Sequence, residues 1–373
     1  MGIEVTTELI MKYLEVEGVV HAGVATPETL AGGPPSTDLS YVMPSAKSAI
    51  SFALPLNLDA IPDYLGKKDR LTYETNYIRV SSLGDGIAVK LANFLKVQGF
   101  DSVPLAVNEV YRADEGTPEE RRGMYPDISH RYLAAASGVG FLGFSGNLLT
   151  NDYGPAIILG GLLTEAELEP TKPLPKEENY CDYYDCLQCC GSCPSKTLHG
   201  QDLVTVTMGG HEHQYGEKSG SLPCAFVCGG FSGLDHSGKW STWATGRFPL
   251  PLTDEEVVAV APMHLEKFNQ RPPAPGGRYH TFSPNPIYYV CSNCQLVCVH
   301  DKEERKRRNK LVRNSGVIVQ NEDGTLEAVT PEEGRKRLDA MEPERRALYE
   351  GEIEPLPEKH ELTEEQDFTH KLN

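Results

Sequence analysis

The segment CDYYDCLQCCGSCP, residues 181–194, holds half of the ten cysteines in this chain. Four of its cysteines follow the spacing C-x4-C-x2-C-x3-C-P, namely Cys181, Cys186, Cys189 and Cys193, and Cys190 is the fifth. A second set later in the chain reads C-x2-C-x3-C and comprises Cys291, Cys294 and Cys298. Between the two sets, LPCAFVCGG contributes Cys224 and Cys228.

This spacing is close to that of bacterial ferredoxins, which bind iron–sulfur clusters through C-x2-C-x2-C-x3-C-P and use the fourth cysteine for the other cluster. The first set differs only in its widened first spacing. The second set lacks its first cysteine, a position that either Cys224 or Cys228 can fill. Eight thiolates are therefore available for two [4Fe–4S] clusters, with Cys190 and one of the two upstream cysteines left over.

Three other roles for these cysteines compete with an iron–sulfur role. Structural zinc also uses paired C-x2-C units, but tetrahedral zinc sites rarely end in C-x3-C-P. A disulfide framework suits small secreted domains, whereas this chain has 373 residues. A redox-active C-x-x-C motif would explain one pair but not both sets. The spacing thus favours two iron–sulfur clusters.

The composition, with 39% hydrophobic and 24% charged residues, is that of a soluble globular protein. The first residues, MGIEVTTELIMKYLEVEG, contain no apolar signal region. No apolar run approaches the roughly 20 residues that a membrane helix needs. Reduced cysteines persist in a reducing compartment, so we expect a cytoplasmic protein with no membrane partner.

The net charge of −18 is unevenly distributed, because residues 314–373 alone carry sixteen acidic and seven basic residues. A strongly acidic protein is a poor general binder of polyanions, which makes tRNA an unlikely partner. One basic run is the exception and consists of Lys302, Arg305, Lys306, Arg307, Arg308, Lys310 and Arg313. It is either a solvated helix face or a docking patch for an acidic electron donor or for RNA.

Helices and strands alternate ahead of the first cysteine set. The hydrophobic pattern predicts helices near 6–16 and 84–100, and strands near 19–26, 49–54, 101–107 and 156–163. This alternation favours a mixture of helices and strands over an all-β fold. Residues 138–143 match G-x-G-x-x-G but follow a helix, whereas a dinucleotide-binding loop needs strand, glycines and helix in that order. We therefore exclude a nicotinamide site.

The glycine-rich run, residues 137–164, carries seven glycines among apolar residues. Glycines at this density permit close approach of the backbone to a flat, bulky ligand. The alternative is a set of tight turns between two core elements.

The segment PDISHRYLAAASGVGFLGFSGNLLTNDYGP (126–155), followed by the two cysteine sets, resembles the cobalamin-dependent iron–sulfur reductases. This family comprises the reductive dehalogenases and the epoxyqueuosine reductases of tRNA modification. Its members share a run like A-x-x-[AS]-G-[LV]-G-x-x-G, a downstream N-x-L-[IL]-T, a CP motif and a second cysteine set whose last member closes the first cluster. The resemblance covers residues 15–165 and 180–300 and is specific in the glycine-rich run and the cysteines.

The resemblance implies ligand sets. Cys181, Cys186, Cys189 and Cys298 would hold one cluster, and Cys193, Cys291, Cys294 and either Cys224 or Cys228 the other. It also implies that the glycine-rich run lines a corrinoid, through Gly138, Gly140, Gly143, Ser145, Gly146 and Asn147.

The fold implied by the resemblance is α+β, with a nitroreductase-like cobalamin-binding domain followed by a ferredoxin-like domain with two [4Fe–4S] clusters. We place the cobalamin-binding region at 1–170 and the iron–sulfur domain at 171–313, with an insertion at 200–285. Residues 314–373 form an acidic tail, without the helical repeats with which many epoxyqueuosine reductases help to grip tRNA.

Four residues just before the glycine-rich run are candidates for proton transfer: Tyr125, Asp127, His130 and Tyr132. We expect Tyr125 and Asp127 to be the proton donors, with His130 or Arg131 adjusting them electrostatically. A helix-capping role is the alternative for Asp127.

These observations together predict an oxidoreductase, a cobalamin- and iron–sulfur-dependent enzyme similar to the reductive dehalogenases, which acts on a small organic substrate. A ferredoxin or flavodoxin would supply its electrons. One alternative is an epoxyqueuosine reductase-like tRNA-modification enzyme, and another is a corrinoid-free ferredoxin-like electron-transfer protein.

Overall fold

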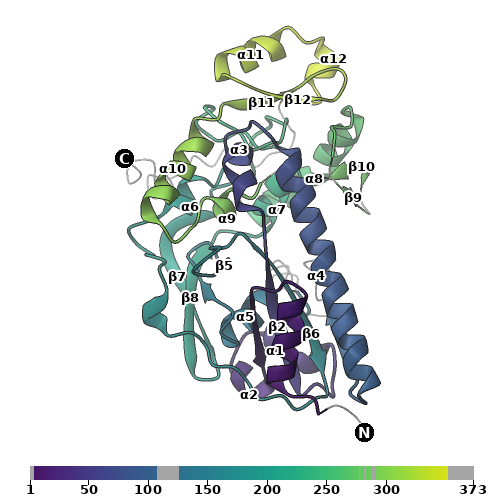
Figure 1. The fold of residues 1–373 in the computed structure, drawn as a ribbon. Helices are drawn as coiled ribbons and strands as arrows, with labels where there is room; N and C mark the ends of the chain where they lie inside the picture. Colours follow the sequence, from purple (N-terminus) through teal and green to yellow (C-terminus); the bar gives the residue numbers. More distant parts are fainter. Residues whose placement is uncertain (1–3, 107–125, 277, 281–282, 288–290, 352–373) are drawn as a thin grey trace. The chain divides into compact units, whose positions relative to one another are not determined.

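The computed structural model of the chain describes residues 4–106, 126–276, 278–280, 283–287 and 291–351 (Figure 1). The chain forms two compact units. Unit 1 consists of Met1–Leu56, Tyr77–Tyr183 and Asp202–Gly216, and unit 2 of Asn57–Asn76, Tyr184–Gln201 and Glu217–Asn373. The polypeptide therefore passes from one unit to the other five times.

Unit 1 is built on a four-stranded sheet with the order β1-β2-β6-β3. The strands are β1 (His21–Ala25), β2 (Ser48–Pro55), β3 (Ser102–Leu105) and β6 (Ile157–Thr164), with a short hairpin of β4 (Phe141–Leu142) and β5 (Leu148–Leu149). The helices are α1 (Thr7–Val16), α2 (Pro27–Leu30), α5 (His130–Ala136) and most of α4 (Leu71–Val97), with short 3-10 helices η1 (Pro35–Thr37), η2 (Leu39–Tyr41) and η5 (Lys176–Glu178). These elements confirm the expected mixture of helices and strands. All neighbouring strands of the sheet are antiparallel, whereas a dinucleotide-binding fold has a mostly parallel sheet.

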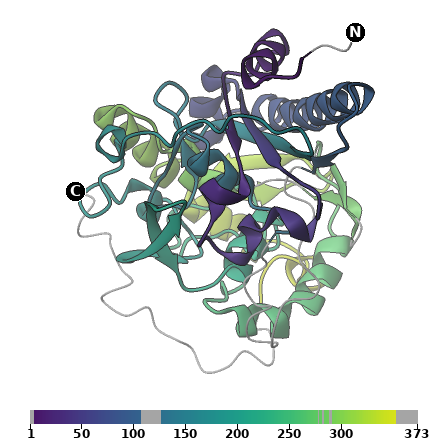
Figure 2. The same cartoon turned by 90° about the horizontal axis from the view of Figure 1, so that it is seen from below.

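Two layers of helices explain why almost every residue of β2 is buried. Helix α5 packs against β1, β2 and β6 on one face, where His130 lies next to Gly161. Helices α1 and α4 lie side by side (Figure 2). The ring of Tyr13 from α1 stacks on that of Phe94 from α4, with their centres 5.7 Å apart. A strand covered on both faces reads as a continuous apolar run, as 49–54 does.

Unit 2 contains mostly short helices. They are α3 (Ile61–Leu65), α6 (Gln188–Gly191), α7 (Leu222–Cys228), α8 (Asp254–Gln270), α9 (Asn293–Leu296), α10 (Lys302–Arg313), α11 (Pro331–Asp339) and α12 (Pro343–Arg346), with the 3-10 helix η3 (Leu58–Ala60). Two hairpins join β9 (Arg278–His280) to β10 (Ser283–Ile287) and β11 (Val317–Gln320) to β12 (Leu326–Val329). A third hairpin, β7 (Leu198–Met208) with β8 (His211–Lys218), belongs in part to each unit. The core of unit 2 includes Trp243, which is buried and donates its indole N–H to the Tyr64 carbonyl at 3.1 Å.

The expected elements before the cysteines are confirmed, with different ends. Helix α1 begins after Thr6, whose hydroxyl caps it by accepting from the Leu9 amide. Helix α4 begins at Leu71, well before residue 84, so the sequence pattern captured only its second half. Within the described ranges, no helix combines the length and the apolarity needed to cross a bilayer.

Candidate functional site

Five cysteines of unit 2 come from three separate segments of the chain. Cys193 follows α6, Cys224 and Cys228 lie on α7, and Cys291 and Cys294 lie before and within α9. The two cysteines of α7 are four residues apart and therefore share one face of the helix. Asn293 joins two of the segments, because its side-chain amide donates to the Ser192 carbonyl at 3.1 Å.

The thiols of these segments influence one another's pKa values. Burial raises the pKa of Cys193, and the neighbouring Cys224 and Cys291 raise it further. Burial likewise raises the pKa of Cys294 well above its usual value, reinforced by Cys224, Cys291 and Cys193. The raised pKa of Cys228 has hydrogen bonds with Cys224 and Cys291 as its main causes, and its thiol donates to the Cys291 carbonyl at 3.4 Å. The five thiols form one group, which we call the distal cysteine group.

The distal cysteine group fits an iron–sulfur cluster better than a single metal ion. Across the described part of the chain, no three His, Cys, Asp or Glu side chains converge tightly enough to bind one ion. A four-iron cluster holds its ligands farther apart, because each thiolate binds a different iron atom. None of the ten cysteines, all of which lie in the described ranges, is in a disulfide. Reduced thiols that gather in one place and repel one another when ionised are suited to a cation-rich cluster, because bound iron offsets the charge of the thiolates.

Neutral hydroxyl groups surround the sulfur of Cys193. The Ser195 hydroxyl lies 3.3 Å from it and the Thr197 hydroxyl 3.7 Å, and the two hydroxyls lie 3.3 Å from each other. All three side chains are buried. Hydrogen bonds of this kind to a ligand sulfur are among the factors that set the potential of an iron–sulfur cluster.

The first cysteine set has a charged neighbour instead. Arg305 of α10 is 2% exposed and donates from Nη1 to the Cys186 sulfur at 3.3 Å and from Nη2 to the His300 carbonyl at 3.2 Å. Cys189 lies beside Cys190, whose hydrogen bond is the main cause of the raised pKa of Cys189. Cys298, the implied partner from the second set, is half-buried after α9.

The basic run forms the amphipathic helix α10. Its outer face is solvated, as one of the two expectations had it, and carries Lys302, Lys306, Arg307 and Lys310, while its buried face binds the cysteine segments. A docking role for the outer face stays a prediction. Besides Arg305, Arg308 donates to the Leu296 carbonyl at 2.9 Å, and Asn309 donates to the Gln188 carbonyl at 2.8 Å. Glu304 pairs with Arg307 at 2.6 Å and with Arg308 at 2.8 Å, which lowers the pKa of Glu304 to about 2. A sequence of alternating charges does not reveal which of them point inward.

Cys181 belongs to unit 1 and contacts the glycine-rich run. Its sulfur accepts a hydrogen bond from the Phe144 backbone amide at 3.3 Å. The Cys181 amide donates to the Asn179 side chain at 3.0 Å, and the Tyr183 hydroxyl donates to the Leu142 carbonyl at 2.8 Å. The thiol is thus held against the loop that joins β4 to β5.

The glycines of this run serve close packing of the chain against itself. Gly138 ends α5 with a φ of +73°, and a side chain there would overlap the Lys172 carbonyl. A side chain at Gly140 or Gly143 would overlap Leu149 of the paired strand. These contacts support the tight-turn role at Gly138, Gly140 and Gly143.

The polar residues of the same run bind one another. Buried Ser145 accepts hydrogen bonds from the Asn147 amide at 3.4 Å and from its side chain at 3.0 Å. Gly146, with a φ of +73°, closes this loop through a bond from its amide to the Gly143 carbonyl at 2.8 Å. Corrinoid binding by these residues stays a prediction that rests on the resemblance.

The candidate proton donors take different positions. Tyr125 lies outside the described residues. Ser129 is the N-cap of α5, accepting from the Tyr132 amide at 3.3 Å, so the capping role considered for Asp127 belongs to Ser129. The Tyr132 hydroxyl lies 2.9 Å from the hydroxyl of Tyr215, a residue of β8 that the sequence pattern did not single out.

His130 is buried on the sheet side of α5. Its Nε2 lies 3.0 Å from the Ala106 carbonyl, and burial lowers its pKa below the usual value. Because a carbonyl only accepts, Nε2 carries the hydrogen, and the ring is neutral near pH 7. In this position His130 supports the fold of unit 1. It can influence the predicted proton donors only as a neutral, dipolar ring and not as a cation.

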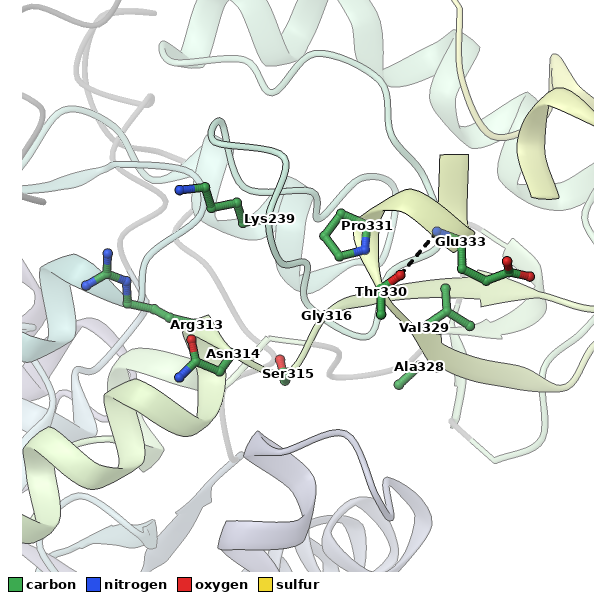
Figure 3. A pocket seen from close by; sticks show the side chains of 10 residues that line it. All are labelled: Lys239, Arg313, Asn314, Ser315, Gly316, Ala328, Val329, Thr330, Pro331 and Glu333. Atoms are coloured by element: carbon green, nitrogen blue, oxygen red, sulfur yellow. Dashed lines mark hydrogen bonds between the residues drawn. The ribbon is translucent and has the colours of Figure 1, made fainter. Parts of the chain in front are cut away.

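Two pockets lie away from the cysteines. One of about 380 Å³ in unit 1 is lined by residues between Pro27 and Ala46. The other, of about 670 Å³ in unit 2, lies where α10 ends and α11 begins. Figure 3 shows Arg313 and Lys239 on one side of this second pocket and Glu333 on the other. Neither pocket is lined by a cysteine, so both are separate from the candidate iron–sulfur site.

Curated proteins similar to this chain are epoxyqueuosine reductases, although no family model matches it. The enzyme of Gloeobacter violaceus is 30% identical over 100 residues, which are 27% of this chain and 30% of that protein. The enzyme of Lactococcus garvieae is 26% identical over 203 residues, which are 48% of this chain and 54% of that protein. The chain thus spans about half or less of the length of these relatives.

A solved structure of epoxyqueuosine reductase with an epoxyqueuosine-modified tRNA-Tyr stem loop is 16% identical over 82% of this chain and 80% of that chain, with a TM-score of 0.38. A TM-score this low adds no weight of its own. The curated relatives confirm the resemblance to the reductase family. They also agree with the expected enzyme class, since a reductase is an oxidoreductase.

Two expectations are wrong. The curated relatives carry the name of the tRNA-modification branch, which was the alternative, and not that of the dehalogenases with small organic substrates. For the same reason, tRNA cannot be set aside as an unlikely partner. The net charge was a poor guide to tRNA binding because it sums all charged groups of the chain. Contacts with phosphates depend instead on local groups of cations.

Proposed function

We propose that this chain, a relative of the epoxyqueuosine reductases, is an iron–sulfur oxidoreductase that reduces epoxyqueuosine in tRNA. One observation carries the proposal, namely the convergence of the distal cysteine group from three segments that are far apart in the sequence. Five cysteines gathered from distant segments are typical of a metal-cluster site rather than of ordinary packing. The names of the relatives supply the substrate.

The electrostatic influences among the thiols support one ligand set for the distal cluster. Cys224 and Cys291 both act on Cys193 and on Cys294, whereas the shift of Cys228 arises from Cys224 and Cys291. We therefore assign Cys193, Cys224, Cys291 and Cys294 to the distal cluster. Cys228 is a neighbour whose thiol donates to the Cys291 carbonyl. The other cluster, on Cys181, Cys186, Cys189 and Cys298, follows from the resemblance.

The proposed reduction of epoxyqueuosine requires a supply of electrons and of protons. Removal of the epoxide oxygen takes two electrons and two protons. Both carbon–oxygen bonds break, a carbon–carbon double bond remains, and the oxygen leaves as water. A bound [4Fe–4S] cluster supplies electrons one at a time, which suits two clusters acting in turn. Electrons would come from an external one-electron donor, and a corrinoid enters the proposal through the resemblance alone.

Proton delivery is the task of the chain itself. The Tyr132 hydroxyl can give up a proton and recover one from Tyr215 across the 2.9 Å contact. Asp127, which does not cap α5, is the carboxyl candidate two residues before the Ser129 cap. His130 cannot serve as the acid, because its lowered pKa leaves the ring neutral near pH 7 and its Nε2 hydrogen is bound to the Ala106 carbonyl.

An assay on the intact chain tests the proposal. Anaerobically reconstituted protein is mixed with a strong one-electron reductant and tRNA that carries epoxyqueuosine, and the nucleosides are analysed by mass spectrometry. We expect the modified nucleoside to lose one oxygen atom, and unmodified tRNA to stay unchanged. Protein that holds its clusters and leaves epoxyqueuosine intact under these conditions contradicts the proposed substrate.

The cofactors have a separate test in the visible spectrum of the same protein. Two [4Fe–4S] clusters should give about eight irons per chain and a broad absorption shoulder that bleaches on reduction. A corrinoid adds sharp bands to that shoulder. Zinc without iron after anaerobic reconstitution would rule out the iron–sulfur assignment.

A further inference from the structure

The buried guanidinium of Arg305 lies directly against a predicted cluster ligand. Its Nη1 is 3.3 Å from the Cys186 sulfur, and its side chain is 2% exposed. The bond to the His300 carbonyl at 3.2 Å fixes the other side of the guanidinium. A cation at this distance from a ligand sulfur is a permanent part of the surroundings of the metal.

The position of Arg305 is maintained by the rest of α10. One turn further on, Arg308 and Asn309 bind the carbonyls of Leu296 and Gln188, which belong to the two cysteine segments. Asp301 caps the helix by accepting from the Glu304 amide at 2.7 Å. The helix therefore has little freedom to move the guanidinium away from Cys186.

We propose that Arg305 is a positioning residue that raises the reduction potential of the cluster bound through Cys186. The proposal rests on the proposed function for the presence of that cluster. When the oxidised cluster accepts one electron from an external donor, it gains one negative charge and no bond forms or breaks. A nearby cation and an N–H···S hydrogen bond both favour the more negative, reduced state.

The charge of Arg305 makes the reduction potentials of the two proposed clusters differ. The sulfur of Cys193 in the distal group has the neutral hydroxyls of Ser195 and Thr197 as neighbours. The Cys186 cluster is therefore the better electron acceptor of the two on account of Arg305. Lys218 acts on the distal Cys294 from β8, but as a half-buried side chain it is more screened by water than Arg305.

A redox titration with dithionite and mediators, followed by electron paramagnetic resonance, measures this effect on the reconstituted full chain. Arg305→Gln removes the charge, and Arg305→Lys keeps it. The matched control is Lys310→Gln, which removes a charge from an exposed position of the same helix.

We expect Arg305→Gln to change the ratio of oxidised to reduced Cys186 cluster at least tenfold in favour of the oxidised form, which is about 59 mV for a one-electron couple. Arg305→Lys should shift it less, and Lys310→Gln should leave both clusters unchanged. An unshifted potential in Arg305→Gln with full iron content, or an equal shift in Lys310→Gln, overturns the inference.

A measurement on the wild type covers the case in which Arg305→Gln does not fold. Labelling arginine with ¹⁵N should give a nitrogen coupling to the electron spin of the reduced cluster, lost in Arg305→Lys. No such coupling contradicts the inference while the proposed function survives. A wild-type chain without any cluster overturns the proposed function first, so the two failures are distinguishable.

Discussion

The glycine-rich run of unit 1 and the distal cysteine group of unit 2 both stand out in the sequence, yet they are built in different ways. Gly143 meets Leu149 of the same short hairpin, six residues further along the sequence, and Gly138 meets Lys172 of the same unit. The distal cysteine group unites residues from Cys193 to Cys294 through three segments. A local pattern can thus be complete within a turn, whereas a ligand set exists only after distant segments fold together.

The two regions are also stabilised by different kinds of interaction. The glycine-rich run is held by backbone hydrogen bonds and apolar contacts, such as the β4–β5 pair. The cysteine segments are held by buried polar and charged side chains, among them Arg305, Arg308 and Asn309. Buried charges are costly unless bonded, so unit 2 is the more sensitive of the two to pH and to single substitutions.

The largest effect is expected from replacing one ligand of the distal cysteine group. Cys224→Ala should remove that cluster and about half of the iron, because a four-iron cluster needs all its thiolates. Cys228→Ala, on the same face of α7, is the matched control and should keep the iron. Iron and sulfide analysis after anaerobic reconstitution separates the two, and retained iron in Cys224→Ala with loss in Cys228→Ala would reverse the assignment.

A large effect on stability is expected in the glycine-rich run. Gly138→Ala places a side chain against the Lys172 carbonyl at a left-handed backbone position, so we expect a loss of about 3 kcal/mol of unfolding free energy. Gly86→Ala is the control, since nothing lies within 4 Å of an added side chain in helix α4, and it should gain about 0.5–1 kcal/mol. Denaturant unfolding under anaerobic conditions measures both. Equal small changes would show that the run tolerates side chains.

A smaller effect tests the pH sensitivity of unit 2. His264 is fully buried between the rings of Phe226 at 4.6 Å and Phe248 at 4.7 Å, and burial lowers its pKa to about 3. The unfolded chain takes up the proton below the usual value of 6.5, whereas the folded chain does so only near 3. Stability contributed by this group is therefore present above pH 6.5 and is lost as the pH falls.

Between pH 7 and pH 5.5 the wild type should lose about 1 kcal/mol more unfolding free energy than His264→Phe. The aromatic replacement keeps the packing and removes the titrating group. Chemical denaturation at a series of pH values provides the comparison. Parallel stability profiles of the two proteins would mean that His264 is protonated without cost in the folded state.

The smallest effect concerns the hydroxyl groups near the distal cluster. Ser195→Ala removes the hydroxyl 3.3 Å from the Cys193 sulfur and should lower the potential of the distal cluster, by less than the tenfold change expected at Arg305. The control is Ser219→Ala, which removes an exposed hydroxyl of the same unit and should leave both potentials unchanged. Redox titration of both variants measures the difference. A shift in the Cys186 cluster instead would contradict the separate surroundings of the two sulfurs.

Regular elements were predictable where the apolar pattern was simple. The buried run 49–54 and the helix capped by Thr6 were both found within one or two residues. The first half of α4 was missed because its sequence mixes exposed Leu71 with buried Tyr73 and gives no regular apolar stripe. Propensity and periodicity do not reveal such a helix, since tertiary contacts decide its buried positions.

The candidate site was predictable in its cysteines but not in their neighbours. Spacing pointed to Cys193, Cys291 and Cys294, whereas Cys224 and Cys228 were two alternatives for one missing ligand. Arg305 was hidden in a charge run, because a sequence does not show which arginine of an amphipathic helix faces inward. Tyr215 was hidden in the insertion, and only the fold brings its hydroxyl to Tyr132. Contacts over long sequence separations carry no local signal.

The interleaving of the two units has a consequence for synthesis on the ribosome. Strand β3 is made before β6, its neighbour in the sheet, and the last segment of unit 1 ends at Gly216, after two segments of unit 2 have emerged. Neither unit can be completed before part of the other has been translated, and no single cut releases either one as a continuous fragment. The chain must therefore mature as a whole, and the cluster proposed for the distal cysteine group can form only after Cys294 has left the exit tunnel.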